Sequence, residues 1–150
     1  MNQALNMDGG IHEIPVPVLA GRLWICGKHF IGPDHAAVLQ RVGASHVVCL
    51  VREGELRGRY DEYVTWLQTS NCSTWYPIHD LSSPPLEEIL PLYQGVIDRL
   101  RRGESVIAHC AAGIGRAGTL AVAVCQLAGM PLNEALRHVR QHRPGAGPEV

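Results

Sequence analysis

The sequence has no excess of charge of either sign. Its 150 residues include 13 Lys and Arg and 14 Asp and Glu, which gives a formal net charge of -1. A chain with this balance has no general electrostatic attraction to nucleic acid or to an anionic membrane. We therefore predict neither as a partner, and any affinity for phosphate must come from a local arrangement of residues.

Long apolar runs are also lacking. The longest nearly apolar stretch, Leu120 to Met130, is interrupted by Gln126 and is too short to span a bilayer. The N-terminal sequence MNQALNMDGGIHEIPVP lacks the basic and then apolar segments of a secretory signal. These absences predict a cytoplasmic protein.

Paired cysteines and metal-binding motifs are missing as well. The five cysteines are an odd number without a Cys-x-x-Cys pair, which favours free thiols in a reducing compartment over a disulfide framework. The eight histidines are scattered, and only His138 and His142 have a helical metal-ligand spacing, without the Glu of a zinc protease. We favour a solvated helix face for that pair and predict no metal and no cofactor.

What the sequence does contain is an alternation of strand and helix patterns that begins near Gly21. The predicted strands are RLWICG, SHVVCLV, STWYPIH and SVIAHC, and the predicted helices are PDHAAVLQRVG, YDEYVTWLQ, PPLEEILPLYQGVIDRLRRG, GRAGTLAVAVCQLAG and PLNEALRHVRQHR. Such an alternation is typical of an α/β fold, with a central, mostly parallel sheet flanked by helices.

The domain boundaries follow from the same pattern. Residues 1–20 hold two adjacent glycines and two prolines without sustained periodicity, which predicts an N-terminal arm. Residues 21–150 are predicted to form a single domain. The chain stops at RPGAGPEV, just after a predicted turn, which leaves open whether a final C-terminal helix is missing.

Cys110 lies where a predicted buried strand ends and a glycine-rich segment leads into a helix. The carboxyl ends of parallel strands are where open α/β sheets bind ligands. The small residues after Cys110 allow a tight turn whose amides can form an anion nest at a helix N-terminus, and this favours a thiolate. Arg116 follows six residues after Cys110, so its guanidinium can bind two phosphate oxygens opposite the thiolate. The combination predicts attack of Cys110 on a phosphate monoester and a phosphocysteine intermediate.

The segment HCAAGIGRAG resembles the His-Cys-x5-Arg signature of protein-tyrosine phosphatases. Gly113, Gly115 and Gly118 lie where the dual-specificity branch has glycines. The resemblance extends over about residues 21–147. The cyclin-dependent-kinase-associated phosphatase group and small atypical dual-specificity phosphatases have a similar order of segments, which in this chain are CLVREGEL, WYPIHDLSSP, HCAAGIGRAG and ALRHVRQHRPGAG. The resemblance implies a cysteine phosphatase fold, and the residues that it implies for substrate binding are Ala111, Ala112, Gly113, Ile114, Gly115 and Arg116. It also implies that His109 supports the loop backbone and does not carry the proton.

A phosphatase also needs a general acid, because the leaving oxygen must be protonated as the phosphorus–oxygen bond breaks. Asp80 is the candidate, 30 residues before Cys110 in the segment WYPIHDLSSPP. Its position resembles the acid loop of dual-specificity phosphatases. A turn-capping role for Asp80 is the alternative, and His79 is a possible substitute donor that alternates with it along the strand.

The signature departs from its relatives after the arginine. Most relatives have Ser or Thr there, whose hydroxyl stabilises the cysteine thiolate as the leaving group, but this chain has Ala117. Thr119 lies two residues further along the helix and should not face the sulfur. We expect a slow second step and accumulation of phosphocysteine.

Several neighbouring residues leave alternatives open. We expect Arg52, Glu53 and Glu55 to border the pocket or to order Arg116 by ion pairing, and a solvated loop is the alternative. In some relatives a cysteine from the region of Cys49 forms a disulfide with the oxidised nucleophile; otherwise Cys49 is a buried structural thiol. The tryptophans and Cys26 are expected in the core.

The variable positions of the signature loop, Ala111, Ala112 and Ile114, are not basic. Relatives that act on phosphoinositides tend to have lysines there, so the sequence favours phosphoprotein substrates, with phosphotyrosine first and phosphoserine and phosphothreonine left open. The predicted function is a protein-tyrosine or dual-specificity phosphatase in which Cys110, Arg116 and Asp80 are catalytic. The alternatives are a weakly active or inactive phosphobinding pseudophosphatase, and the sulfur or arsenate chemistry of other cysteine-loop enzymes. The sequence does not indicate an oligomeric state.

Overall fold

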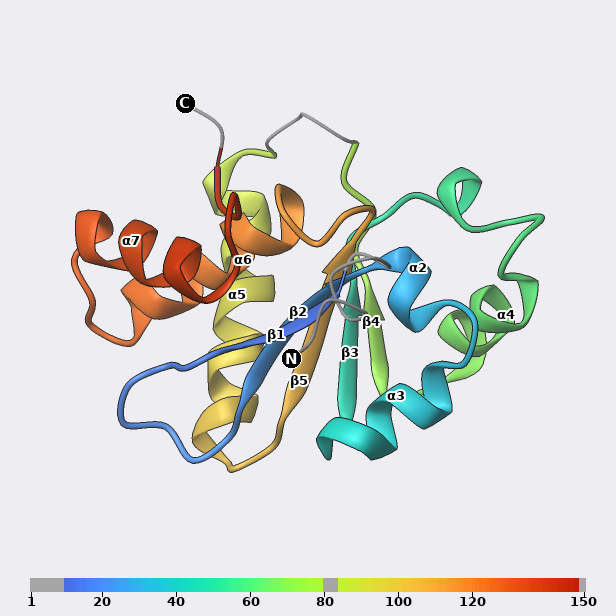
Figure 1. Ribbon diagram of the computed structural model, residues 1–150, viewed down its shortest axis with the longest axis horizontal. Coiled ribbons are helices and arrows are strands. Elements are labelled where there is room, and N and C mark those ends of the chain that lie inside the picture. The colour runs from blue at the N-terminus through green and yellow to red at the C-terminus, as the bar shows by residue number, and fades with distance from the viewer. Residues whose placement is uncertain (1–9, 80–83, 149–150) are drawn as a thin grey trace.

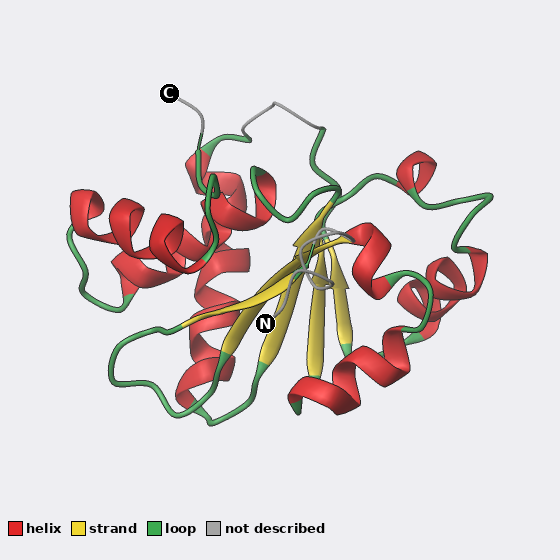
Figure 2. Ribbon diagram, viewed as in Figure 1, coloured by secondary structure: helices red, strands yellow, loops and turns green. Residues whose placement is uncertain are grey.

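The computed structural model describes residues 10–79 and 84–148, and its strands form one five-stranded sheet (Figures 1 and 2). The strand order is β1-β2-β5-β3-β4, so β5, which ends at Cys110, lies in the centre. Only β1 is antiparallel to its neighbour; the other pairs are parallel. The strands are β1 (Ile11–Ile14), β2 (Leu23–Gly27), β3 (His46–Cys49), β4 (Ser73–Trp75) and β5 (Val106–Cys110).

The central strands are buried along their whole length because helices cover both faces of the sheet. Every residue of β3 and β5 is buried, as is usual for parallel strands with two covered faces. The register places Cys110 beside Gly27 of β2, and His109 between Cys26 of β2 and Cys49 of β3. The nucleophile candidate therefore stands at the carboxyl edge of the sheet, over the core.

The helices form two layers, one on each side of the sheet (Figure 1). On one side, α6 packs against β2 and β5, α5 packs against β5, and α7 packs against α6 and β1. On the other side lie the two amphipathic helices α3 and α4, together with the short α2. Their bounds are α2 (Lys28–Ile31), α3 (His35–Val42), α4 (Asp61–Thr69), α5 (Leu86–Arg101), α6 (Arg116–Leu127) and α7 (Leu132–His142), with a 3-10 turn η1 (Glu53–Glu55).

The regular helices follow the apolar periodicity of the sequence. In α5 the five buried residues recur at spacings of three, four and one, so one stripe faces the sheet. The helix α6 has eight buried residues, because it lies between the sheet and its neighbours α5 and α7. All the strands and long helices expected from the pattern are thus present, although β4 is shorter than its apolar segment.

Three short elements were not expected from the sequence. Strand β1 lies within residues 1–20, and it exists by pairing with β2, where Ile11 and Ile14 become buried. The single-turn α2 and the η1 turn are too short to show a helical repeat. Their position depends on the sheet edge, where α2 contacts the loop that follows Cys110 and η1 contacts the first residue of α6.

The described residues include no helix that is long and apolar enough to cross a membrane. All three tryptophans are partly buried and pack against the core, and Cys26 is fully buried. His138 and His142 lie on α7, where His138 contacts the Pro15 carbonyl and His142 the His138 carbonyl.

Candidate active site

Cys110 is the last residue of β5, and the loop of residues 111–115 connects it to the first residue of α6, Arg116. The Cys110 side chain is almost completely buried, with 2% of the residue exposed. Its sulfur accepts a hydrogen bond from the Ala117 amide at 3.4 Å. This amide belongs to the first turn of α6, where the unpaired N–H groups and the helix dipole stabilise negative charge. The fold therefore places the Cys110 sulfur at a helix N-terminus.

The loop after Cys110 turns its carbonyl groups outward. Four successive carbonyl oxygens accept hydrogen bonds from outside the loop: Ala111 from the Lys28 amide at 3.0 Å, Ala112 and Gly113 from the Arg143 side chain at 2.8 and 2.9 Å, and Ile114 from the Gly147 amide at 3.0 Å. In a trans peptide the N–H points opposite to the C=O, and the described chain contains no cis peptide. The amides of residues 112–115 are therefore directed to the inside of the loop, as an anion nest requires.

Two glycines of this region are required by their surroundings. Gly113 has a φ of +75°, and a Cβ there would lie 2.5 Å from the Cys26 carbonyl carbon. A Cβ on Gly118 would lie 2.2 Å from the Gly147 nitrogen. Gly115 differs, because its φ is -74° and a Cβ would meet no described heavy atom within 4 Å. The tight turn thus depends on Gly113, whereas Gly115 meets no steric demand.

The guanidinium of Arg116 is held beside the loop by Glu55 of η1. Both carboxylate oxygens accept from Arg116, Oε2 from Nη1 and Oε1 from Nη2, each at 2.9 Å. Nη1 also donates to the Ile78 carbonyl at 2.8 Å, and Arg116 is 7% exposed. Glu55 therefore forms an ion pair with Arg116 and is not part of a solvated loop.

Glu55 is itself fixed by its neighbours. Its carboxylate accepts from the Arg52 amide at 2.8 Å, and its carbonyl accepts from the Lys28 ammonium at 3.0 Å. Burial acts to raise the pKa of Glu55, but the hydrogen bonds from Arg116 and from the Arg52 amide outweigh it and hold the pKa below its usual value. Glu55 therefore stays ionised opposite the arginine.

His109 is a neutral part of the core beneath the loop. Its Nε2 lies 2.6 Å from the Tyr63 hydroxyl, and its Nδ1 lies 3.4 Å from the Cys110 carbonyl oxygen. Burial is the main cause that lowers the pKa of His109 to about 4. Hydrogen bonding of Nδ1–H to the carbonyl leaves Nε2 to accept from Tyr63. The ring thus contributes position, and no charge, at neutral pH.

The residues that follow Arg116 offer the sulfur an amide but no hydroxyl. Ala117 donates its N–H, and the Thr119 hydroxyl donates to the Gly115 carbonyl at 2.8 Å, within its own helix. As expected, Thr119 does not replace the missing hydroxyl.

Asp80 lies outside the described residues. His79, the substitute donor, is described and exposed. The segment that leads to both is attached to the site, because Ile78 donates its amide to the Leu50 carbonyl at 3.0 Å and its carbonyl accepts from Arg116.

The five cysteines are free thiols, and all except Cys72 are buried. Burial raises the pKa of Cys49 to about 12. Cys49 is therefore a weak nucleophile as it stands, and its pairing with an oxidised Cys110 stays a prediction. Among the residues that the structure describes, no group of three or more His, Cys, Asp or Glu could hold a metal ion.

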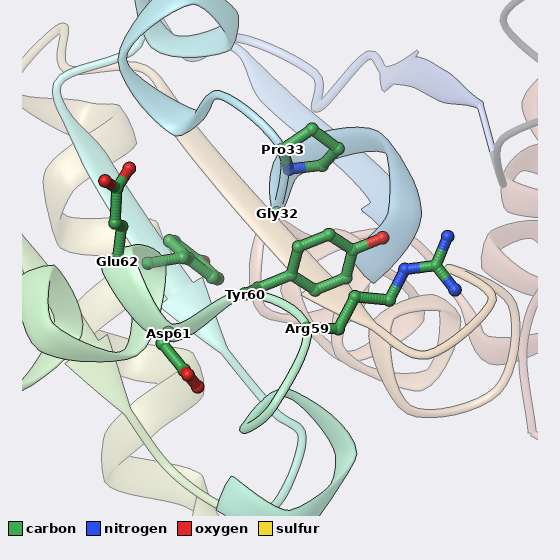
Figure 3. A pocket seen from close by; sticks show the side chains of 7 residues that line it. Gly32, Pro33, Arg59, Tyr60, Asp61 and Glu62 are labelled. Atoms are coloured by element: carbon green, nitrogen blue, oxygen red, sulfur yellow. The ribbon is translucent and has the colours of Figure 1, made fainter.

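The structure also has a surface hollow of about 480 Å³, and Figure 3 shows the side chains that line it. It is formed between the turn after α2 and the start of α4, with Arg59, Tyr60 and Asp61 on its wall. The Tyr60 hydroxyl lies 2.6 Å from Nδ1 of His29, so a hydrogen bond connects this side of the hollow to α2. None of the residues that line the hollow belongs to the loop after Cys110.

Sequence reasoning missed Lys28 and Arg143, which contact the loop from outside, and His12, which contacts Arg143. They come from three separate elements, and no local pattern distinguishes them from surface residues. The only available signal was the arginine directly before Pro144, at the end of a predicted amphipathic helix.

A cysteine at the end of a central parallel strand, a tight loop and an arginine at the start of a helix define the cysteine phosphatase fold, and known structures agree. Tk-PTP in its active form has 29% sequence identity and a TM-score of 0.68, covering 91% of this chain and 88% of that chain. Kinase associated phosphatase, with a serine in place of its catalytic cysteine, has 16% identity and a TM-score of 0.76 over 93% of this chain and 86% of that one. Human DUSP28 has 19% identity and a TM-score of 0.68 over 93% and 84%.

Residues 22–146 match the family described as PTP-SAK, Swiss Army Knife protein, DSP-PTPase phosphatase domain, and the chain belongs to this family. Family and fold together support a protein phosphatase of the dual-specificity type.

Proposed function

We propose that this protein hydrolyses phosphate monoesters on phosphoproteins through a phosphocysteine intermediate on Cys110. The observation that carries the proposal is the loop between Cys110 and Arg116. Its carbonyls are held outward, its amides are directed inward, and the sulfur lies under the Ala117 amide. A ring of donors around a nucleophile stabilises the charge that develops on a transferring phosphoryl group.

The reaction has two steps. In the first, the Cys110 thiolate attacks phosphorus, the bond to the substrate oxygen breaks, and Asp80 gives that oxygen a proton. In the second, Asp80 takes a proton from water, the water oxygen attacks phosphorus, and the sulfur leaves as thiolate with release of inorganic phosphate. The loop amides and Arg116 bind the non-bridging oxygens in both steps.

The Arg116 and Glu55 pair supports this assignment. A guanidinium bound by a carboxylate on one edge is already oriented, so little side-chain entropy is lost when phosphate binds. For Asp80 the support is its place in the sequence, two residues after Ile78, whose carbonyl accepts from Arg116.

The surface of the loop supports one class of substrate. Ala112 is exposed, and Ile114 is an apolar residue with 38% exposure. Such a border suits the side chain and backbone of a phosphopeptide better than the additional phosphates of an inositol lipid. We infer phosphotyrosine as the first substrate, and phosphoserine and phosphothreonine as further ones. The four buried free thiols support a reducing compartment such as the cytoplasm.

One observation favours a second candidate, a phosphobinding pseudophosphatase. Ala117 gives the sulfur no hydroxyl, and the Thr119 hydroxyl is bonded to the helix backbone. A loop that binds phosphate but does not transfer it to sulfur and on to water would act as a binding module.

A rapid-quench time course with para-nitrophenyl phosphate separates the two candidates. The enzyme hypothesis predicts a burst of about one nitrophenol per protein, followed by slow release. The burst should be absent in Cys110→Ser and weaker in Asp80→Asn. If no nitrophenol forms above the Cys110→Ser background while tungstate, an inert analogue of phosphate, still binds, the pseudophosphatase is correct.

A further inference from the structure

Arg143 contacts the catalytic loop from the side opposite to the expected substrate. Its Nη2 donates to the Ala112 carbonyl at 2.8 Å, and its Nε donates to the Gly113 carbonyl at 2.9 Å. One guanidinium fork therefore holds two successive peptide groups of the loop. The residue is 5% exposed although it comes from the turn after α7, 30 residues beyond Gly113.

The Arg143 side chain is fixed by His12 of β1. Nη1 of Arg143 lies 2.5 Å from Nδ1 of His12. Because an arginine nitrogen cannot accept a hydrogen bond, His12 Nδ1 is the acceptor and the ring is neutral. Burial and the nearby Arg143 both lower the pKa of His12, which keeps it neutral. The contact joins β1, the turn after α7 and the loop into one unit.

The hydrogen bonds from Arg143 matter for the shape of the loop. They hold the Ala112–Gly113 and Gly113–Ile114 peptides, which are those most able to rotate. Gly113 has positive φ, and a glycine can leave that conformation at little cost. When both carbonyls are held outward, the amides of Gly113 and Ile114 point inward. If either peptide rotates, a carbonyl oxygen replaces an N–H at the anion site and repels phosphate.

We propose that Arg143 is a positioning residue for the reaction: it holds the Ala112 and Gly113 carbonyls outward so that the loop presents its amides to the substrate phosphate, and His12 orients it. This proposal rests on the function proposed above, since it concerns the same anion site. Arg143 acts through the loop backbone and does not itself touch the substrate.

The test compares tungstate affinity in Arg143→Met, Arg143→Lys and the control Arg137→Met. Arg137 is exposed on α7, so its replacement removes the same charge from the helix that precedes Arg143. Calorimetric titrations are made well below the Tm of each variant, where lower stability alone leaves the affinity of the folded molecules unchanged. We expect about 10- to 30-fold weaker binding in Arg143→Met, because two charge-assisted hydrogen bonds are lost. Lys can reach one carbonyl only, so Arg143→Lys should lose about threefold to tenfold, and Arg137→Met less than about twofold.

Affinity of Arg143→Met equal to that of Arg137→Met overturns the proposal. If Arg143→Met does not fold, Arg143→Lys decides, and wild-type affinity in that variant overturns the proposal as well. Failure of the proposed function looks different. If the unmodified protein neither binds tungstate nor releases nitrophenol, the site itself is misassigned and the positioning role falls with it.

Discussion

At the scale of single residues, the site is organised around the ion pair between Arg116 and Glu55. Only 4% of the arginine side chain and 18% of the glutamate side chain are exposed, so solvent screens this pair less than the surface pairs. A buried charge that loses its partner is costly. The orientation of Arg116 should therefore depend on the charge of Glu55.

The substitution Glu55→Gln tests this dependence. It keeps the shape of the side chain but removes the charge and one acceptor oxygen, so Arg116 loses its fork partner. We expect kcat/KM for para-nitrophenyl phosphate to fall about tenfold, the equivalent of one charge-assisted hydrogen bond. Glu53→Gln is the matched control, because Glu53 is half exposed and pairs with Arg57. Equal activity of the two variants would show that Glu55 does not position the arginine.

A second prediction concerns Ala117. In Ala117→Ser a hydroxyl is placed near the sulfur, where it can stabilise the departing thiolate. The slow phase after the burst should become about tenfold faster, because one hydrogen bond made in the transition state contributes about 1.4 kcal/mol. The burst itself should keep its amplitude. Thr119→Ala is the control and should leave the slow phase unchanged, since its hydroxyl bonds to the Gly115 carbonyl. An unaltered slow phase in Ala117→Ser would place the limiting step elsewhere.

At the scale of elements, the loop between β5 and α6 depends on close contact with β2. Gly113 lies against the backbone of Cys26 and Gly27, and the Lys28 amide donates to the Ala111 carbonyl. The loop is therefore shaped by the end of β2 and the start of α2 as much as by its own residues.

Two substitutions, Gly113→Ala and Gly115→Ala, separate the effect of contact with β2 from the effect of the loop's own residues. A Cβ at Gly113 combines a positive φ with a 2.5 Å contact to the backbone, so we expect a loss of about 2 kcal/mol or more in the free energy of unfolding. Gly115→Ala should change stability by less than about 1 kcal/mol, because its φ is negative and the space is open. Urea denaturation measures both. Similar losses in the two variants would mean that the close approach of the loop to β2 does not limit stability.

At the scale of the whole molecule, the burial of His109 makes the stability of the folded protein depend on pH. Burial lowers its pKa to about 4 in the folded protein, while the unfolded chain has the ordinary value of 6.5. Between these values the unfolded state binds the proton and the folded state does not, so stability falls as the pH drops from 6.5 towards 4. The pKa values of His46 and Glu55 are also lowered, and their contributions have the same sign.

We predict that His109 alone contributes about 2 kcal/mol to the decrease in stability between pH 7 and pH 5. Urea denaturation of the protein and of His109→Phe at both pH values measures the contribution of His109 to the decrease in the free energy of unfolding. The variant will be less stable at pH 7, but its decrease towards pH 5 should be smaller. His138→Gln, on the outer helix α7, is the control and should retain the full decrease. Equal decreases in the protein and in His109→Phe would show that His109 is not the group responsible.

The sequence by itself determined the order of the long elements and the position of the loop between Cys110 and Arg116. Periodicity is a local property, so an apolar stripe in α5 or an apolar run in β5 can be read without knowing its partner. The same holds for Cys110 and Arg116, because the strand, the tight loop and the helix N-terminus that carry them are continuous in sequence. Asp80 was found in the same way, and its role stays a prediction.

Only the tertiary structure decided which side chains surround that loop. His12 and Arg143 are 131 residues apart, and Glu55 and Arg116 are 61 apart, yet both pairs meet at the carboxyl edge of the sheet. Strand β1 likewise exists through its pairing with β2. Contacts of this kind depend on how the elements pack, and a charged residue bears no local mark of whether packing will bury it against a partner or leave it in solvent.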